Sequence, residues 1–207
     1  PLRIDIDRYK DLSRHYSVSR IPYVFIVDAN GEVVVQELGY MGKDQTLQLL
    51  KDYAVNTSFF RNESLGYYQH PNYVTSLRMA QKYLDFSLYL QDEVKKDFLN
   101  VAENYLKYGK NFLEKDQANF ALMNQKMELL EMNSDVYRDN LSKVERQIEM
   151  LTEGEIDENN KRLYSFLNFL VAVDKGDEDL IKKWKDALIL EDGTGIFQKK
   201  SEIFFQE

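Results

Sequence analysis

The sequence contains no cysteine, and this absence excludes several classes of chemistry. Without a thiol, the chain cannot form a disulfide, bind a metal through thiolates or attack a substrate through sulfur. Its two histidines, His15 and His70, lie far apart with no metal-ligand spacing around them. There is also no glycine-rich phosphate loop, no Gly-x-Ser-x-Gly motif and no His-Glu-x-x-His motif. We therefore predict no catalytic residue, metal site or cofactor in the 207 residues.

Basic residues and long apolar runs are also scarce. The 27 Lys and Arg residues are outnumbered by 35 Asp and Glu, which gives a net charge of -8 and disfavours a nucleic-acid partner. The lysine pairs at 95–96, 182–183 and 199–200 have acidic neighbours, and we interpret them as solvated helix faces. The longest apolar run, residues 166–173, is interrupted by Asn168 and is far shorter than the roughly 20 residues of a membrane-spanning helix. No membrane span is predicted.

Proline is confined to the first third of the chain, at positions 1, 22 and 71. The long stretch after Pro71 has no proline, so it is predicted to be helical. The sequence therefore predicts a first domain at residues 1–56, a junction at 57–72 and an all-α domain at 73–207. Because the chain starts with Pro1 and has no signal-peptide pattern, we interpret it as part of a longer product.

The first region alternates between strand and helix patterns. We predict strands at residues 4–7, 23–27 and 32–36, and helices at residues 9–16 and 43–53. Asn30-Gly31 predicts a tight hairpin between the last two strands. The resulting order is β-α-β-β-α with a mixed sheet, so the predicted fold class is α+β, a partial α/β unit followed by an all-α domain. So small a unit leaves a sheet edge unpaired and a sheet face uncovered, as half of a domain would.

Several motifs follow one another in this region: Arg3-Ile-Asp-Ile-Asp7, Leu12-x-x-x-Tyr16-x-Val18-x-x-Ile21-Pro22, an apolar strand, Asp28-x-x-Gly31, a valine-rich strand and Gly39-Tyr40. Their order resembles the C-terminal half of a thioredoxin-like domain, over about residues 2–56. In that family, the Ile-Pro step is a cis peptide facing the redox centre, and the residue before the proline lends its backbone to a bound substrate peptide. The resemblance therefore implies that Ile21 and Pro22 bind a protein or peptide substrate.

Residues 73–207 carry apolar side chains at helical spacing. We predict about six helices, marked by residues 74–88, 94–112, 120–130, 137–151, 163–173 and 180–188, with Ser134 and Asp135 as a possible cap of the fourth. The last pair resembles the second helix of a tetratricopeptide repeat, although its spacing from glycine to alanine is one residue short. The resemblance implies an array of helical hairpins that binds other proteins. The alternative is a helical domain that only packs on its neighbour and stabilises it.

Two hypotheses for the function remain open. The reactive Cys-x-x-Cys of the thioredoxin-like family would fall before Pro1, so the parent protein is either a thiol-disulfide oxidoreductase or a non-catalytic binding or structural module of the same fold. Thioredoxin-like proteins with extra domains resemble cell-envelope proteins of bacteria, which makes the envelope one hypothesis for the location and the cytoplasm the other. The substrate and the oligomeric state stay open.

Overall fold

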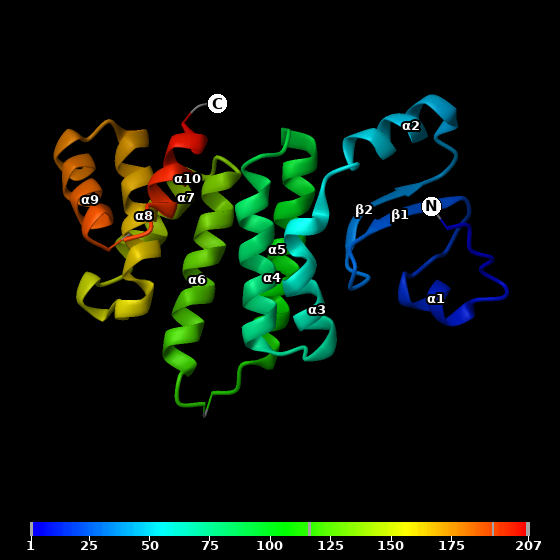
Figure 1. Cartoon of the computed structure of the whole chain (residues 1–207), viewed down its shortest axis with the longest axis horizontal. Coiled ribbons are helices and arrows are strands. Elements are labelled where there is room, and N and C mark those ends of the chain that lie inside the picture. The colour runs from blue at the N-terminus through cyan, green and yellow to red at the C-terminus, as the bar shows by residue number, and fades with distance from the viewer. Residues whose placement is uncertain (1, 116, 192, 206–207) are drawn as a thin grey trace. The chain divides into compact units, whose positions relative to one another are not determined.

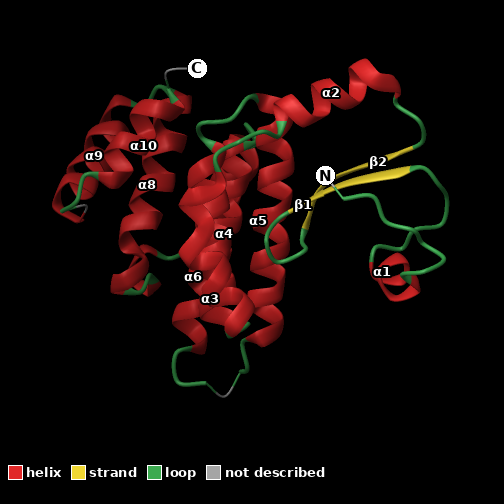
Figure 2. Cartoon of the chain, turned by 45° about the vertical axis from the view of Figure 1, so that its right-hand side comes forward, coloured by secondary structure: helices red, strands yellow, loops and turns green. Residues whose placement is uncertain are grey.

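The computed structural model describes residues 2–115, 117–191 and 193–205. The chain forms two compact units, Pro1–Asn56 and Thr57–Glu207, called here the N-terminal unit and the helical unit. The first unit runs from blue to cyan in Figure 1, and the second runs from cyan to red. Helices make up most of the described chain (Figure 2), and the sheet has only two strands.

The N-terminal unit is a hairpin flanked in sequence by two helices. Its elements are α1 (Lys10–His15), β1 (Tyr23–Val27), β2 (Val33–Leu38) and α2 (Gly42–Asp52). The strands are antiparallel, with Phe25 opposite Gln36, and the register shifts after Ile26 so that Val27 lies opposite Val33. The two helices and the hairpin predicted in this region are confirmed.

Asp28 organises the turn of the hairpin. Its Oδ1 atom accepts hydrogen bonds from the backbone N–H groups of Asn30 (2.8 Å) and Glu32 (3.0 Å). Gly31 has φ +85°, and a Cβ atom there would lie 3.2 Å from the Tyr16 hydroxyl, which donates to the Gly31 carbonyl oxygen at 3.0 Å. Glycine is favoured in this conformation because it has no Cβ. Of the two residues from which the hairpin turn was predicted, Gly31 has a positive φ and Asn30 does not.

The predicted α+β fold class with a mixed sheet is wrong, because the described residues contain one two-stranded antiparallel sheet. The strand expected at residues 4–7 is absent, and residues 6–8 form a turn. The carboxylate of Asp5 accepts from the backbone N–H of Asp7 at 2.9 Å, and the Asp5 carbonyl accepts from Tyr9 at 3.0 Å. An aspartate that captures nearby backbone amides competes with strand pairing. Without this strand, the sheet has no parallel pair.

The helical unit is built from helices that pack on their neighbours in sequence. Its elements are η1 (Thr57–Phe60), α3 (Arg61–Gln69), α4 (Tyr73–Ser87), α5 (Asp92–Phe112), α6 (Phe120–Tyr137), α7 (Leu141–Glu149), η2 (Glu153–Glu155), α8 (Glu158–Lys175), α9 (Glu178–Glu191) and α10 (Ile196–Phe204). Helix α4 packs along α5, α6 packs on α5 and α8, and α8 packs along α9 (Figure 1). Within the described ranges, no helix is long and apolar enough to cross a membrane.

Helix α4 begins with a capping box directly after Pro71. The Asn72 side chain accepts from the backbone N–H groups of Val74 and Thr75, and the Thr75 hydroxyl accepts from the Asn72 N–H at 3.0 Å. These bonds satisfy N–H groups that a helix start otherwise leaves unpaired. The cap fixes the residue at which α4 begins.

The core of the helical unit lies between α4, α5, α6 and α8. Leu84 and Val101 have no exposed surface, and neither has Phe166 on α8. Gly109 on α5 allows the close approach of its neighbours, because a Cβ atom there would lie 3.0 Å from the Met127 Cε atom. The helices therefore pack at van der Waals distance around one apolar interior.

Three sequence predictions differ from the structure in this unit. The segment at 57–72, expected to be a junction, forms η1 and α3, and Phe60 is buried with its ring 4.6 Å from that of Tyr83. Ser134 and Asp135 lie inside α6 and cap nothing. The break comes later, at Asp139, whose φ of +61° ends the helical path. Helix α10 was not predicted.

We expect the Leu84→Ala substitution to lower the free energy of unfolding by about 2–5 kcal/mol, because it leaves a cavity in a packed core. Urea unfolding followed by circular dichroism measures this change. The matched control is Leu65→Ala on α3, where 52% of the side chain is exposed and the expected change is below about 0.5 kcal/mol. Equal losses for the two variants would contradict the assignment of the core.

Candidate functional site

Ile21 and Pro22 lie in the loop that leads into β1. The peptide bond between them is cis, as the resemblance implied, and both residues are exposed, Ile21 to 69% of its surface. The backbone N–H of Gly39 donates to the Pro22 carbonyl oxygen at 2.9 Å, which joins the start of β1 to the end of β2. The exposed Ile21 side chain therefore lies next to a backbone segment that the hydrogen bond between Gly39 and Pro22 fixes to the hairpin. The substrate-binding role of the two residues stays a prediction.

No residue among positions 2–56 is buried, which separates the N-terminal unit from an ordinary folded domain. Large apolar side chains that are more than a third exposed occur throughout it: Leu2, Ile4, Tyr9, Leu12, Ile21, Val27, Leu38, Tyr40, Leu47 and Leu50. An apolar side chain gains stability when it leaves water, so this unit forgoes part of the available gain. Exposed apolar side chains that adjoin one another are typical of a surface that another polypeptide covers.

Aromatic side chains provide the packing that the N-terminal unit does have. The Phe25 ring on β1 lies 4.4 Å from the Tyr23 ring and 5.2 Å from the Tyr16 ring. Tyr16 follows α1, so this contact and its hydrogen bond to Gly31 place α1 on the hairpin. The hairpin and the edge around Ile21 are therefore held by a few half-buried rings.

The structure brings together no catalytic group near the Ile21 edge. The chain has no cysteine, and the ranges that the structure describes contain no group of three His, Asp or Glu residues able to hold a metal ion. His15 belongs to the N-terminal unit and His70 to the helical unit.

A second candidate site is a polar pocket of about 610 Å³ in the helical unit. Residues of α4, α6, α9 and α10 line it together with the first turns of α8. Its volume falls within the range of sites for small molecules. Its charged groups include Asp85 and Lys200, which form an ion pair, and Lys126. This pocket was not predicted from the sequence.

The ion pair of Lys200 with Asp85 connects α10 to α4 on the wall of the pocket. The Lys200 Nζ atom lies 2.5 Å from Asp85 Oδ1 and 4.8 Å from the centre of the Phe197 ring. Lys200 is 8% exposed. Burial raises the pKa of the Tyr137 phenol above its ordinary value, and the negative charge of Asp85 adds to this effect. A cation and an anion are therefore in direct contact on the wall of the pocket.

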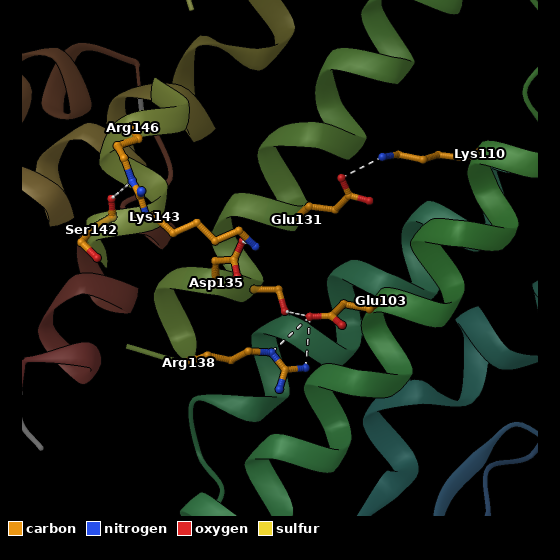
Figure 3. A network of polar contacts seen from close by, with 9 residues as sticks. Glu103, Lys110, Glu131, Asp135, Arg138, Ser142, Lys143 and Arg146 are labelled. Atoms are coloured by element: carbon orange, nitrogen blue, oxygen red, sulfur yellow. Dashed lines mark hydrogen bonds and ion pairs between the residues drawn. The ribbon is translucent and has the colours of Figure 1, made fainter. Parts of the chain in front are cut away.

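A network of polar contacts joins α5, α6 and α7 on another part of the helical unit (Figure 3). Glu103 accepts hydrogen bonds from Ser134 (2.9 Å) and Arg138 (3.1 Å), and Lys143 lies 2.7 Å from Asp135. Lys143 and Glu103 are about half exposed. Their partners Asp135 and Arg138 are largely buried, with 13% and 18% of their side chains exposed. The network therefore joins the three helices as part of their packing and offers no evidence of a site.

Two of the lysines interpreted as solvated are buried. Lys95 is 5% exposed and Lys200 is 8% exposed, whereas Lys96 and Lys199 are exposed. Successive residues of a helix point about 100° apart, so one lysine of a pair can face inward while the other faces water. Helix α10 could have been predicted from the four-residue spacing between Ile196 and Lys200, which places both residues on one face of a helix.

No family model, curated protein or solved structure matches the chain. The likeness of residues 2–56 to a thioredoxin-like domain therefore stays a prediction, and so does the likeness of the last helices to a tetratricopeptide repeat. The function has to be inferred from the residues and from the geometry of the two candidate sites.

We expect the Lys200–Asp85 pair to couple α10 to α4 by about 1–2 kcal/mol, because removing one partner leaves the other charge poorly solvated. A double-mutant cycle with Lys200→Met and Asp85→Ala measures this coupling from urea unfolding. The matched control cycle uses Lys183 and Glu153, 3.0 Å apart but at least half exposed, with an expected coupling below about 0.5 kcal/mol. Equal coupling in both cycles would contradict a structural role for the pair.

Proposed function

We propose that the N-terminal unit is part of a thioredoxin-like domain that binds extended segments of protein substrates at the Ile21–Pro22 edge. The parent protein would then be a thiol-disulfide oxidoreductase whose cysteines lie outside this chain. The helical unit would select protein partners. The observation that carries the proposal is the absence of any buried residue at positions 2–56 beside a well-formed hairpin edge.

This observation supports the proposal through a simple argument about packing. A two-stranded sheet is marginal in water unless apolar side chains cover a face of it. The hairpin here has its ladder, its turn and the bond from Gly39 to Pro22. None of its apolar side chains is fully buried within the unit, and Val27 and Leu38 stay 41% and 49% exposed. The missing cover would come from the rest of a thioredoxin-like domain and, at Ile21, from a bound substrate.

The position of Ile21 suits contact with an extended peptide. Its side chain is 69% exposed, and it directly precedes Pro22, whose carbonyl oxygen is already occupied by the Gly39 N–H. The backbone at this point is therefore held in place while the Ile21 side chain stays available. Burying such a side chain contributes about 1.5–3 kcal/mol, which is enough to favour apolar substrate segments.

The second candidate function is polypeptide binding without redox chemistry. It is favoured by the lack of cysteine and of a recognisable catalytic motif in the sequence. It uses the same Ile21–Pro22 edge, so the two candidates differ only in what accompanies that edge. Counting thiols in the full-length translation product separates them.

Alkylation of the reduced full-length product should add two or more alkyl groups, measured by mass spectrometry, because thiol-disulfide exchange by this family needs a Cys-x-x-Cys pair. No added group would eliminate the oxidoreductase and leave the binding function. In the parent protein, we expect Ile21→Asp to lower kcat/KM for reduction of a disulfide-bonded peptide by about tenfold.

The control for that variant is Leu47→Asp on α2, a side chain that is also exposed, to 44%, but lies away from the Ile21–Pro22 step in the sequence. It should retain the kcat/KM of the unmodified protein. If Ile21→Asp retains full activity as well, the Ile21–Pro22 edge does not bind substrate, whatever the number of thiols.

A further inference from the structure

Asn30 and Gly31, at the turn of the hairpin, form a dipeptide with a chemistry of its own. The backbone nitrogen of the residue after an asparagine can attack the side-chain amide carbon, a reaction that ends in deamidation. Glycine obstructs this attack least, because it has no Cβ. Asn30 is the only asparagine of the chain that a glycine follows. The sequence therefore makes Asn30 the asparagine that is chemically most susceptible to this reaction.

The reaction needs water and no other reagent. The Gly31 nitrogen, once it has lost its proton to solvent, attacks the Asn30 Cγ atom and expels the Nδ2 group as ammonia, which leaves a cyclic imide. Water then opens the imide at one of its two carbonyl carbons. Opening at Cγ gives aspartate, and opening at the main-chain carbonyl carbon gives isoaspartate, in which the main chain runs through Cγ. In both cases one water is consumed and one ammonia is released.

The folded turn keeps the attacking nitrogen away from the reaction. The Gly31 N–H donates to the Asp28 carbonyl oxygen at 3.1 Å, and the Asn30 N–H donates to Asp28 Oδ1 at 2.8 Å. The first bond shields the Gly31 proton from solvent, as a hydrogen bond shields an amide from hydrogen exchange. Attack requires the loss of that proton, so the bond to Asp28 has to break first. Deamidation therefore requires opening of the turn.

Three further hydrogen bonds close the same turn. The Asp28 N–H donates to the Glu32 carbonyl oxygen at 2.9 Å, and the Glu32 N–H donates to Asp28 Oδ1 at 3.0 Å. The Tyr16 hydroxyl donates to the Gly31 carbonyl oxygen at 3.0 Å. Tyr16 directly follows α1, so the turn is held from within the hairpin and from the end of that helix.

The part of the chain that contains Asn30 is also the part that packing protects least. No residue among positions 2–56 is buried, and a two-stranded sheet is marginal in water. Asn133 and Asn160 in the helical unit are only 2% and 1% exposed. Opening of the hairpin therefore requires less free energy than opening of the helices that contain those two asparagines.

From this geometry we propose that Asn30 is a deamidation site whose rate is set by opening of the hairpin. The products weaken the hairpin in turn. Aspartate at position 30 adds a negative charge between Asp28 and Glu32 in the sequence, and isoaspartate lengthens the main chain within the turn. The modification is thus a one-way change of the unit that contains Ile21. This proposal does not depend on the function proposed for that unit.

The test follows the conversion of Asn30 in the native chain, in mildly alkaline buffer at constant temperature. Trypsin then releases residues 21–43, which contain no asparagine besides Asn30, and mass spectrometry measures the change from asparagine to aspartate or isoaspartate. The reference is a peptide of residues 26–33, which is too short to form the hairpin. We expect the native chain to convert Asn30 about ten- to hundredfold more slowly than the peptide, which corresponds to an opening free energy of about 1.4–2.7 kcal/mol.

Two variants test whether the turn sets the rate. Tyr16→Phe removes the hydroxyl bond to Gly31 and should raise the rate in the native chain about fivefold. Asp28→Ala removes both bonds to Oδ1 and should raise the rate further, towards that of the peptide. The matched control is Tyr40→Phe, which removes a hydroxyl from a side chain that is 87% exposed and should leave the rate unchanged. Asp28→Ala in the peptide should also have no effect, because the peptide has no turn to open.

Asn56 provides an internal control in the same sample. It is exposed and lies outside the helices and strands, but the side chain of Thr57 obstructs the attack on its amide carbon. Asn56 should therefore stay unconverted while Asn30 changes. The proposal is overturned if Asn30 converts no faster than Asn56, if the native chain converts Asn30 as fast as the peptide does, or if Tyr16→Phe leaves the rate unchanged.

Discussion

Both units of the chain need to remove apolar side chains from water in order to be stable. For a hairpin of two strands this means that apolar side chains must cover one of its faces. The helical unit meets the need for burial internally, since residues such as Leu84, Val101 and Phe166 have no exposed surface. The N-terminal unit does not meet it, because no residue among positions 2–56 is buried. Its ladder, turn and aromatic contacts are in place, yet ten of its large apolar side chains stay more than a third exposed. The proposal of a binding edge at Ile21 and Pro22 rests on that difference.

The helical unit combines a well-packed interior with a polar pocket whose groups are nearly all engaged. The pair of Lys200 with Asp85 anchors α10 to α4, and the carboxylates on the wall already have partners. The pocket is therefore a place where charged side chains of α4, α6, α8, α9 and α10 are held together by the packing of those helices.

Periodicity predicted most of the helices, because apolar spacing such as that from Val94 to Phe112 reports a buried face directly. It failed for the strand at residues 4–7, where the Asp5 side chain captures backbone amides and no neighbouring strand is present. The interpretation of the lysine pairs was wrong for Lys95 and Lys200, because acidic neighbours in the sequence do not show which of two adjacent residues faces inward. The pocket could not be predicted, since Lys126, Asn160 and Lys200 are distant in sequence and meet only through the packing of α6, α8 and α10.

Native-state hydrogen exchange of the chain tests most directly the claim that the N-terminal unit lacks a core of its own. The account predicts that the ladder amides of β1 and β2, including Phe25 and Val35, open with free energies well below those of Leu99 and Val101 in α5. Protection of the hairpin equal to that of α5, in the chain alone, would show that residues 1–56 are stable without further cover and would contradict the account.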